Sequence, residues 1–272
     1  MRLKLLKKIL MEAKNKMTGS KSTNTNNKIV AKKGIYTKRD DGRKMDEVRP
    51  MTAKVGIVPS ADGSASFQTG KTKAIAVVRG PRKLHPQHMQ DSQTGILRVN
   101  YGMMPFSVED RIRPGPNRRS EEISKVTEWA LSSVVDLSGF PNTVVDVFIQ
   151  IPQADAGTRV AGINAAAMAL AHAGIPMKQM VSAIGVGKID KTLVVDLDKF
   201  EDSEFHDEEG STDIPVVLTS RKKDIALLQL DGKISIPEFK EVIVMAKKAC
   251  EDILKVQMEA LKNVNNEEED NE

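Results

Sequence analysis

The order of predicted elements in the middle of the chain restricts the possible folds. Residues 143–151 are rich in β-branched residues, which predicts a strand. The segments 120–137 and 158–173 on either side carry apolar residues at helical spacing, and the second ends at Gly174 with Pro176 just beyond. With a further strand predicted at 96–103, the order is β-α-β-α, which is typical of domains that mix sheets and helices.

Short strands separated by turn signals fill the rest of the chain. We expect strands at 52–58, 65–69, 73–78, 181–187, 192–197, 214–219 and 225–230, and an exposed loop at 85–95. Asp62 and Gly63 predict a hairpin turn between the first two strands. Pro237 suits the first turn of a long helix at 237–262. The sequence therefore predicts an α+β fold with mixed β-sheets and few, long helices.

Composition excludes several classes of protein. In 272 residues, 40% are apolar, which is enough for a substantial core. The single cysteine, Cys250, excludes a disulfide framework and a cysteine-based zinc site, and the four histidines form no zinc-binding pattern. The longest apolar run, 165–171, is too short to cross a bilayer. We expect a soluble, cytoplasmic protein with no membrane partner.

The net charge of +4 is unevenly distributed. Residues 1–39 hold twelve Lys or Arg and one acid, whereas residues 267–272 hold five acids and no base. This divides the chain into a basic flexible extension (1–39), a nearly neutral domain (40–263) and an acidic tail (264–272). The extension carries no secretory signal. Its first residues fit either a disordered segment or a basic amphipathic helix that contacts a membrane surface or RNA.

Three consecutive residues are suited to binding an anion. Gly157, Thr158 and Arg159 lie between a predicted buried strand and a predicted helix start, where free backbone amides attract negative charge. Glycine allows close approach, and the arginine fork matches phosphate. Taken alone, the pattern fits a phosphate site or a plain helix cap.

A second group of arginines precedes the other predicted helix. Prolines at 114 and 116 stiffen the segment and keep it from forming a solvated helix face. The segment is either a charged surface loop or a second anion-binding helix start that faces the first. Its arginines are Arg111, Arg113, Arg118 and Arg119.

Acidic residues crowd between 196 and 213. Most of them fit a solvated loop. Asp213 differs because it directly precedes an apolar strand, where a carboxylate is held rigidly enough for general acid catalysis or for binding a divalent ion.

Taken in order, six stretches of the chain resemble the RNase PH family, and most closely its archaeal exosome branch, over about residues 41–263. These stretches are DGRKMDEVRP (41–50), ADGSA (61–65), GPRKLHPQH (80–88), PFSVEDRIRPGPNRRSEEIS (105–124), QADAGTRVAGINAA (153–166) and TDIPV (212–216).

The resemblance implies an RNase PH-like fold and phosphorolysis, in which inorganic phosphate as co-substrate attacks the last phosphodiester at the 3′ end of single-stranded RNA. The family's phosphate-binding residues match Gly157, Thr158, Arg159 and Arg119. Arg118 matches a companion arginine that contacts the RNA backbone. The physical logic agrees, because two anions must be brought together by fixed cations.

The segment 82–88 matches a loop that contacts RNA in the family. The resemblance assigns RNA contacts to Arg82, His85 and His88. Gln87 stands where the family usually has an arginine, so one electrostatic contact is missing from the pattern.

The acidic loop departs from the family, in which two aspartates six positions apart serve the chemistry. Asp213 matches the second, which acts as the general acid or holds Mg²⁺ or Mn²⁺. The first is either Asp202, which follows VVDLDK, or Asp207, six residues before Asp213 with Gly210 at the family's glycine position. An insertion of five residues separates the two. The spacing favours Asp207, and Asp207 and Asp213 are then the predicted metal ligands.

The exosome resemblance also implies partners. It predicts a catalytic subunit that alternates with a non-catalytic sibling in a hexameric ring of three heterodimers, with RNA-binding cap subunits and with RNA in the central channel. Run in reverse, the reaction would add RNA tails from nucleoside diphosphates. Two alternatives stay open: an RNase PH-type enzyme that trims transfer RNA 3′ ends, and a ring subunit that binds RNA without catalysis.

Overall fold

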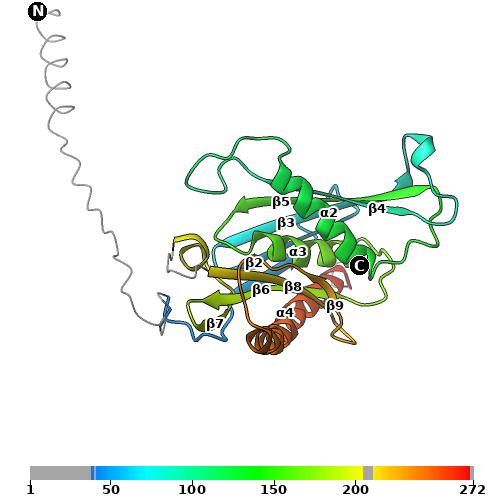
Figure 1. Cartoon of the computed structure of the whole chain (residues 1–272). Helices are drawn as coiled ribbons and strands as arrows, with labels where there is room; N and C mark the ends of the chain where they lie inside the picture. The colour runs from blue at the N-terminus through cyan, green and yellow to red at the C-terminus, as the bar shows by residue number, and fades with distance from the viewer. Residues whose placement is uncertain (1–37, 40, 205–210, 270–272) are drawn as a thin grey trace, which may run out of the picture. The chain divides into compact units, whose positions relative to one another are not determined.

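The computed structural model describes residues 38–39, 41–204 and 211–269 (Figure 1). All of these residues belong to one compact unit. Residues 1–37 of the predicted extension, Asp207 and the last three residues lie outside the described part. In the part that is described, no helix combines the length and the apolar character that crossing a bilayer requires.

The first sheet has five strands in the order β1-β2-β3-β5-β4. β4 and β5 are parallel, because α2 (Arg118–Ser132) returns the chain between them, and the other pairs are antiparallel. The strands are β1 (Met51–Val55), β2 (Gly63–Thr69), β3 (Thr72–Lys83), β4 (Ile96–Met103) and β5 (Thr143–Gln153). A single 3₁₀ turn (Gln87–Met89) follows β3.

The second sheet has four antiparallel strands in the order β7-β6-β8-β9. They are β6 (Val181–Ile189), β7 (Thr192–Val195), β8 (Ser211–Thr219) and β9 (Ile225–Leu228). A short π-helical turn (Phe200–Glu204) follows β7. Two sheets with three described helices confirm the predicted α+β class.

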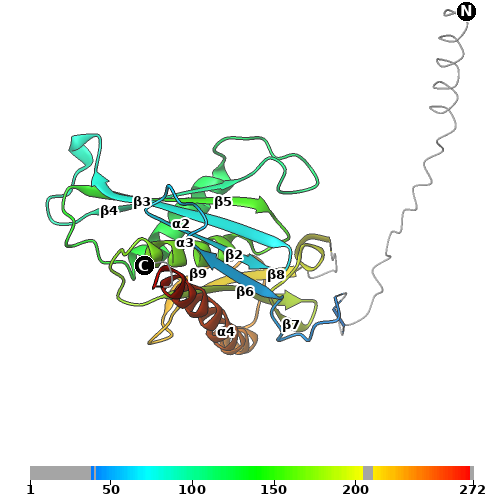
Figure 2. The ribbon, with the colours of Figure 1, turned by 180° about the vertical axis from the view of Figure 1, so that it is seen from behind.

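Helix α3 (Thr158–His172) is the centre of the core. It packs against β2, β3 and β5 of the first sheet and against β6 of the second, and Figure 1 shows it between the two sheets. Burial on both sides explains why its sequence is apolar nearly all round rather than on one stripe. Seen from behind in Figure 2, α4 (Ile236–Glu269) runs along the second sheet, where it contacts β6.

Gly63 has a different role from the predicted one. The connection between β1 and β2 spans residues 56–62, so Asp62 and Gly63 do not form a two-residue hairpin turn. A Cβ at Gly63 would lie 2.4 Å from the carbonyl oxygen of Ala169 in α3. Glycine is needed there because the strand and the helix backbones approach closely.

Two helix ends differ from the predicted ones. α2 ends at Ser132, and the apolar Val134 and Val135 beyond it are buried outside the helix, where Val135 forms a bridge with Met177. Tertiary packing therefore explains their helix-like spacing. α4 continues to Glu269, into the predicted acidic tail, since glutamate is a strong helix former.

Candidate active site

The N-terminus of α3 is prepared for an anion. Gly157 occupies the N-cap position with φ of 64°, in the left-handed region that glycine adopts at little cost, and no side chain caps the helix. Thr72 fixes the preceding loop: its Oγ1 donates to the Ala156 carbonyl at 2.7 Å and accepts from the Asp155 amide at 2.9 Å. The first amides of α3 are therefore held in place for a ligand rather than used by a cap.

The N-terminus of α2 differs. Asn117 caps it, with its Oδ1 accepting from the Ser120 amide at 2.8 Å, and Ser120 Oγ accepts in turn from the Asn117 amide at 2.9 Å. Of the two helix starts, only that of α3 lacks a side-chain cap. The contribution of α2 to an anion site is thus the side chain of Arg119.

One cavity of about 250 Å³ brings most of the predicted site together. Arg119 from α2, the start of α3 and Asp213 from β8 meet in it, although they are far apart in the sequence. Asp202, from the turn after β7, lines it as well. The polar and glycine residues of its wall are Arg119, Gly157, Thr158, Arg159, Gly185, Lys199, Asp202 and Asp213.

Arg159 is held by two side chains that the sequence analysis did not identify. Its guanidinium donates to Oε1 of Gln229, and its Nη2 lies 3.7 Å from Oε1 of Glu122. Gln229 in turn donates to the same Glu122 oxygen at 2.9 Å. Glu122 and Gln229 line an adjoining cavity of about 460 Å³ that also includes Arg119 and both aspartates.

Asp213 is electrostatically unusual. Burial raises the pKa of its carboxyl to about 7, the charges of Asp202 and Asp231 add to the rise, and Arg159 opposes it. Desolvation also raises the pKa of Asp202, which Arg119 counteracts. Asp213 and Asp231 exchange two backbone hydrogen bonds of 2.9 Å, which fix the backbone of Asp213. A carboxyl with a pKa near neutrality is suited to donating a proton.

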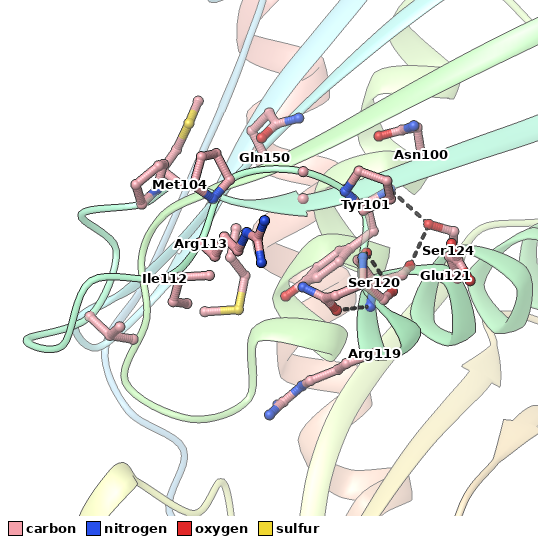
Figure 3. Close-up of a pocket in the computed structure, with 18 residues that line it drawn as sticks. Asn100, Tyr101, Met104, Ile112, Arg113, Arg119, Ser120, Glu121, Ser124 and Gln150 are labelled. Carbon is pink, nitrogen blue, oxygen red and sulfur yellow. Dashed lines mark hydrogen bonds between the residues drawn. The ribbon is translucent and has the colours of Figure 1, made fainter.

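A third cavity, of about 600 Å³, lies beside α2 and shares Arg119 with the site. Figure 3 shows Arg113, Tyr101, Ser120 and Gln150 around it. The stiff segment before α2 therefore forms a wall of this cavity, and of its arginines Arg113 and Arg119 line it.

The structure does not bring every predicted site residue to the cavity. Arg118 is exposed and is not among the residues that line these three cavities. Arg82, with 54% of its side chain exposed, shares the Asp146 carboxylate with Arg98. His85 and His88 lie in the exposed loop after β3. Arg82, His85 and His88 are likewise absent from the walls of the three cavities.

Comparisons with known proteins identify the family of this chain. The sequence matches both domain models of the 3′ exoribonuclease family (RNase PH), domain 1 over residues 47–176 and domain 2 over residues 179–249. The chain therefore belongs to the RNase PH 3′ exoribonuclease family.

The individual proteins that this chain resembles include archaeal exosome components and one rice protein. Over 225 residues, which are 83% of this chain and 88% of that protein, the chain is 52% identical to the exosome complex component Rrp41 of Thermococcus kodakarensis. It is 43% identical over 235 residues to Rrp41 of Methanopyrus kandleri, covering 86% of this chain and 95% of that protein. The crystal structure of rice (Oryza sativa) Rrp46 superposes with a TM-score of 0.72 at 24% identity, over 82% of this chain and all of that one.

These matches confirm the predicted family, its likeness to an archaeal exosome component, the fold and the 3′ exoribonuclease class. The roles of individual residues stay predictions.

Proposed function

We propose that this chain is the catalytic subunit of an exosome ring and degrades RNA from its 3′ end by phosphorolysis. The family match and the Rrp41 relatives support the class of enzyme. The observation that carries the proposal is the 250 Å³ cavity, because it unites Arg119, the uncapped start of α3 and Asp213. Two arginines and free amides suit an inorganic phosphate, and the carboxyl beside them suits proton transfer.

The chemistry follows from these groups. Arg119, Arg159 and the amides of Gly157 and Thr158 hold inorganic phosphate, and one of its oxygens forms a bond to the last phosphorus of the RNA. The bond from that phosphorus to the 3′ oxygen breaks, and Asp213 in its protonated form gives that oxygen a proton. The products are a nucleoside 5′-diphosphate and RNA shorter by one nucleotide. Cations that are already in place lower the barrier, since both reactants are anions.

We propose Asp202 as the partner of Asp213. The two carboxylates line one cavity, and the charge of Asp202 contributes to the raised pKa of Asp213. Asp207, which the spacing favoured, lies outside the described residues and becomes the comparison in the experiments below.

The donor set fits Mg²⁺ or Mn²⁺, which bind through one or two carboxylates together with substrate oxygens. Asp202 and Asp213 line one cavity and would hold the ion when both are ionised, as an alternative to proton donation by Asp213; within the described ranges no group of three or more His, Cys, Asp or Glu is arranged for a metal. Bound there, the ion supplies electrostatic stabilisation of the charge that develops on the leaving oxygen.

We further propose that Arg118, Arg82, His85 and His88 contact the RNA backbone away from the reacting phosphate. Arg118 and Arg82 are exposed, which leaves them accessible to a strand that approaches the cavity.

In the ring, a non-catalytic RNase PH-like sibling alternates with this chain as three heterodimers, and RNA-binding caps sit above the channel. The buried free thiol of Cys250 agrees with a cytoplasmic location.

The test is an RNA degradation assay with and without inorganic phosphate, performed on the chain alone and on the chain assembled with its sibling. We expect RNA loss only with phosphate, nucleoside diphosphates as products, and tail synthesis when nucleoside diphosphates are in excess. The isolated chain should degrade RNA poorly, because its RNA contacts are few. Monophosphate products without phosphate would refute phosphorolysis, and full activity of a monomer would refute the ring.

A further inference from the structure

The segment that leads into β1 carries buried arginines with no assigned role. It includes the stretch DGRKMDEVRP, on which the family resemblance partly rests. Arg39 is fully buried and Arg49 is 5% exposed, although arginine is seldom buried without partners. A buried guanidinium must satisfy its donors within the protein, so its partners indicate what it does.

Arg39 is hydrogen-bonded to the end of β7 and to the turn that follows it. Its Nε and Nη2 donate to the two carboxylate oxygens of Glu201 at 2.8 and 2.6 Å. Its Nη1 and Nη2 also donate to the carbonyls of Val195 and Asp196, each at 2.7 Å. Such a bidentate pair fixes orientation as well as distance. Arg39, which the sequence analysis assigned to the flexible extension, is thus part of the folded body.

Glu201 is in turn hydrogen-bonded to Asp198, which restrains the turn that carries Asp202. Its amide donates to Asp198 Oδ1 at 2.9 Å, and its carboxylate accepts from the Asp198 amide at 3.1 Å. The Asp202 amide donates to the Asp198 carbonyl at 2.9 Å. The turn from Asp198 to Asp202 is closed on itself and is anchored by Arg39, directly beside the carboxylate that lines the active-site cavity.

Arg49 makes the corresponding link to the anion loop. Its Nε and Nη2 donate to the carboxylate of buried Asp196 at 2.8 and 2.7 Å, and its Nη1 donates to the Asp155 carbonyl at 2.6 Å. A Cβ at Gly157 would lie 3.3 Å from Nη2 of Arg49, so the guanidinium lies against this loop. Asp196 is the shared hub, because its carbonyl accepts from Arg39 and its carboxylate accepts from Arg49.

We infer that Arg39 and Arg49 are positioning residues of the active site. Arg39 fixes the turn that presents Asp202, and Arg49 fixes the loop that presents the amides of α3. Neither guanidinium lines the active-site cavity, so both act through other groups. The inference rests on the proposed phosphorolysis and predicts that the two arginines affect different kinetic constants.

Substitution of arginine by lysine removes the planar, bidentate guanidinium but keeps the positive charge. Arg39→Lys should lower kcat about tenfold or more, because a misplaced catalytic group is costly, while KM for phosphate stays within about twofold. Arg49→Lys should raise KM for phosphate about fivefold or more, since it loosens the loop that binds the ion. Arg221→Lys, at an exposed position, is the matched control and should leave both constants unchanged.

The assays use the full chain assembled with its sibling, with ring assembly and thermal unfolding recorded for each variant. Arg39→Ala is avoided because it would remove the bidentate guanidinium from the buried Glu201 carboxylate. Glu201→Gln is the second variant: it removes the charge but keeps the shape, and kcat should fall about threefold or more. It decides the role of Arg39 if Arg39→Lys does not assemble.

Hydrogen exchange gives a reading that does not depend on activity. Arg39→Lys should speed exchange in peptides that cover residues 196–204, and Arg49→Lys should speed it in peptides that cover residues 154–160. A wild-type ring without phosphate-dependent activity would refute the proposed function. The hydrogen-exchange rates would still show whether Arg39 and Arg49 hold their two loops in place. Assembled variants with unchanged kcat and KM in an active ring, or exchange that rises equally everywhere, would overturn the inference.

Discussion

Nη2 of Arg159 lies 3.7 Å from Oε1 of Glu122, so the arginine proposed to bind phosphate is already beside an acid. Gln229 donates to the same Glu122 oxygen and accepts from Arg159, which makes a three-residue cluster. The acid orients the guanidinium, but its negative charge also competes with an incoming phosphate.

Glu122→Gln should therefore tighten phosphate binding. Because Glu122 is about half exposed, the ion pair contributes at most about 1 kcal/mol, and KM for phosphate should fall by up to about fivefold. The effect should shrink at high salt. Phosphate titrations at two salt concentrations measure it, and a KM that rises at both would show that orientation by the Glu122 charge outweighs competition.

The two candidate carboxylates can be separated by three substitutions. Asp213→Asn should reduce turnover about a hundredfold or more, since an amide has the same shape but can neither donate the proton nor hold an ion. Asp202→Asn should cost about tenfold in turnover, and Asp207→Asn should leave turnover within about twofold. RNA affinity, measured with a labelled oligonucleotide, should change little in all three. A large loss at Asp207 with none at Asp202 would reverse our assignment.

Much of this site could be predicted because its residues carry local signals. Gly157, Thr158 and Arg159 lie between a recognisable strand and a recognisable helix, and Arg119 starts another helix, so pattern alone places them at element ends. The choice between Asp202 and Asp207 could not be made in this way. It depends on how the five inserted residues are accommodated, which spacing along the chain does not encode.

The residues that the sequence analysis missed act through tertiary contacts. Gln229 reaches Arg159 from 70 positions away, and Arg39 reaches Glu201 from 162 positions away. Neither has a sequence neighbour that marks it, and Arg39 lies in a basic stretch whose composition predicts disorder. The one available signal is the DGRKMDEVRP stretch, which contains Arg49 and begins two residues after Arg39. The same reasoning applies to Gly63, whose need for glycine comes from α3 and not from a local turn.

The raised pKa of Asp213 predicts a pH-dependent stability. Its folded value of about 7 exceeds the ordinary 3.8, so the folded protein holds this proton more tightly than the unfolded chain. The resulting stabilisation is fully present below about pH 4 and is lost as the pH rises through 7. Relative to wild type, Asp213→Asn should therefore gain stability between pH 5 and pH 8, on the order of a few kcal/mol, at about 1.4 kcal/mol per pKa unit.

Urea unfolding of both proteins at pH 5 and pH 8, in chelator and without phosphate, measures this gain. Asp91→Asn is a control at an exposed position. A difference between Asp213→Asn and wild type that is the same at both pH values would show that the carboxyl titrates normally.

Cys250 should be protected in the folded protein. It is 5% exposed, its Sγ lies 3.5 Å from the Ser182 carbonyl, and burial raises the pKa of its thiol to about 12. At pH 8 little thiolate is present and little surface is accessible, so a thiol reagent should react about a hundredfold more slowly than in urea. Rapid stoichiometric labelling of the native protein would show that α4 opens from the second sheet.

Two truncations test where the basic extension ends and the functional body begins. Deleting residues 1–34 should leave kcat and KM for phosphate within about twofold, because the restraints on the active site that the described residues provide begin at Arg39. Deleting residues 1–39 removes Arg39 as well, which takes the bidentate guanidinium away from the buried Glu201 carboxylate and frees the turn that carries Asp202. That deletion should lower kcat about tenfold or more, with a smaller effect on KM for phosphate. Steady-state assays of the two rings, at matched assembly, measure the difference. Equal activity of both truncations would place the function of the segment elsewhere, whereas a loss already at 1–34 would favour an extension that holds RNA.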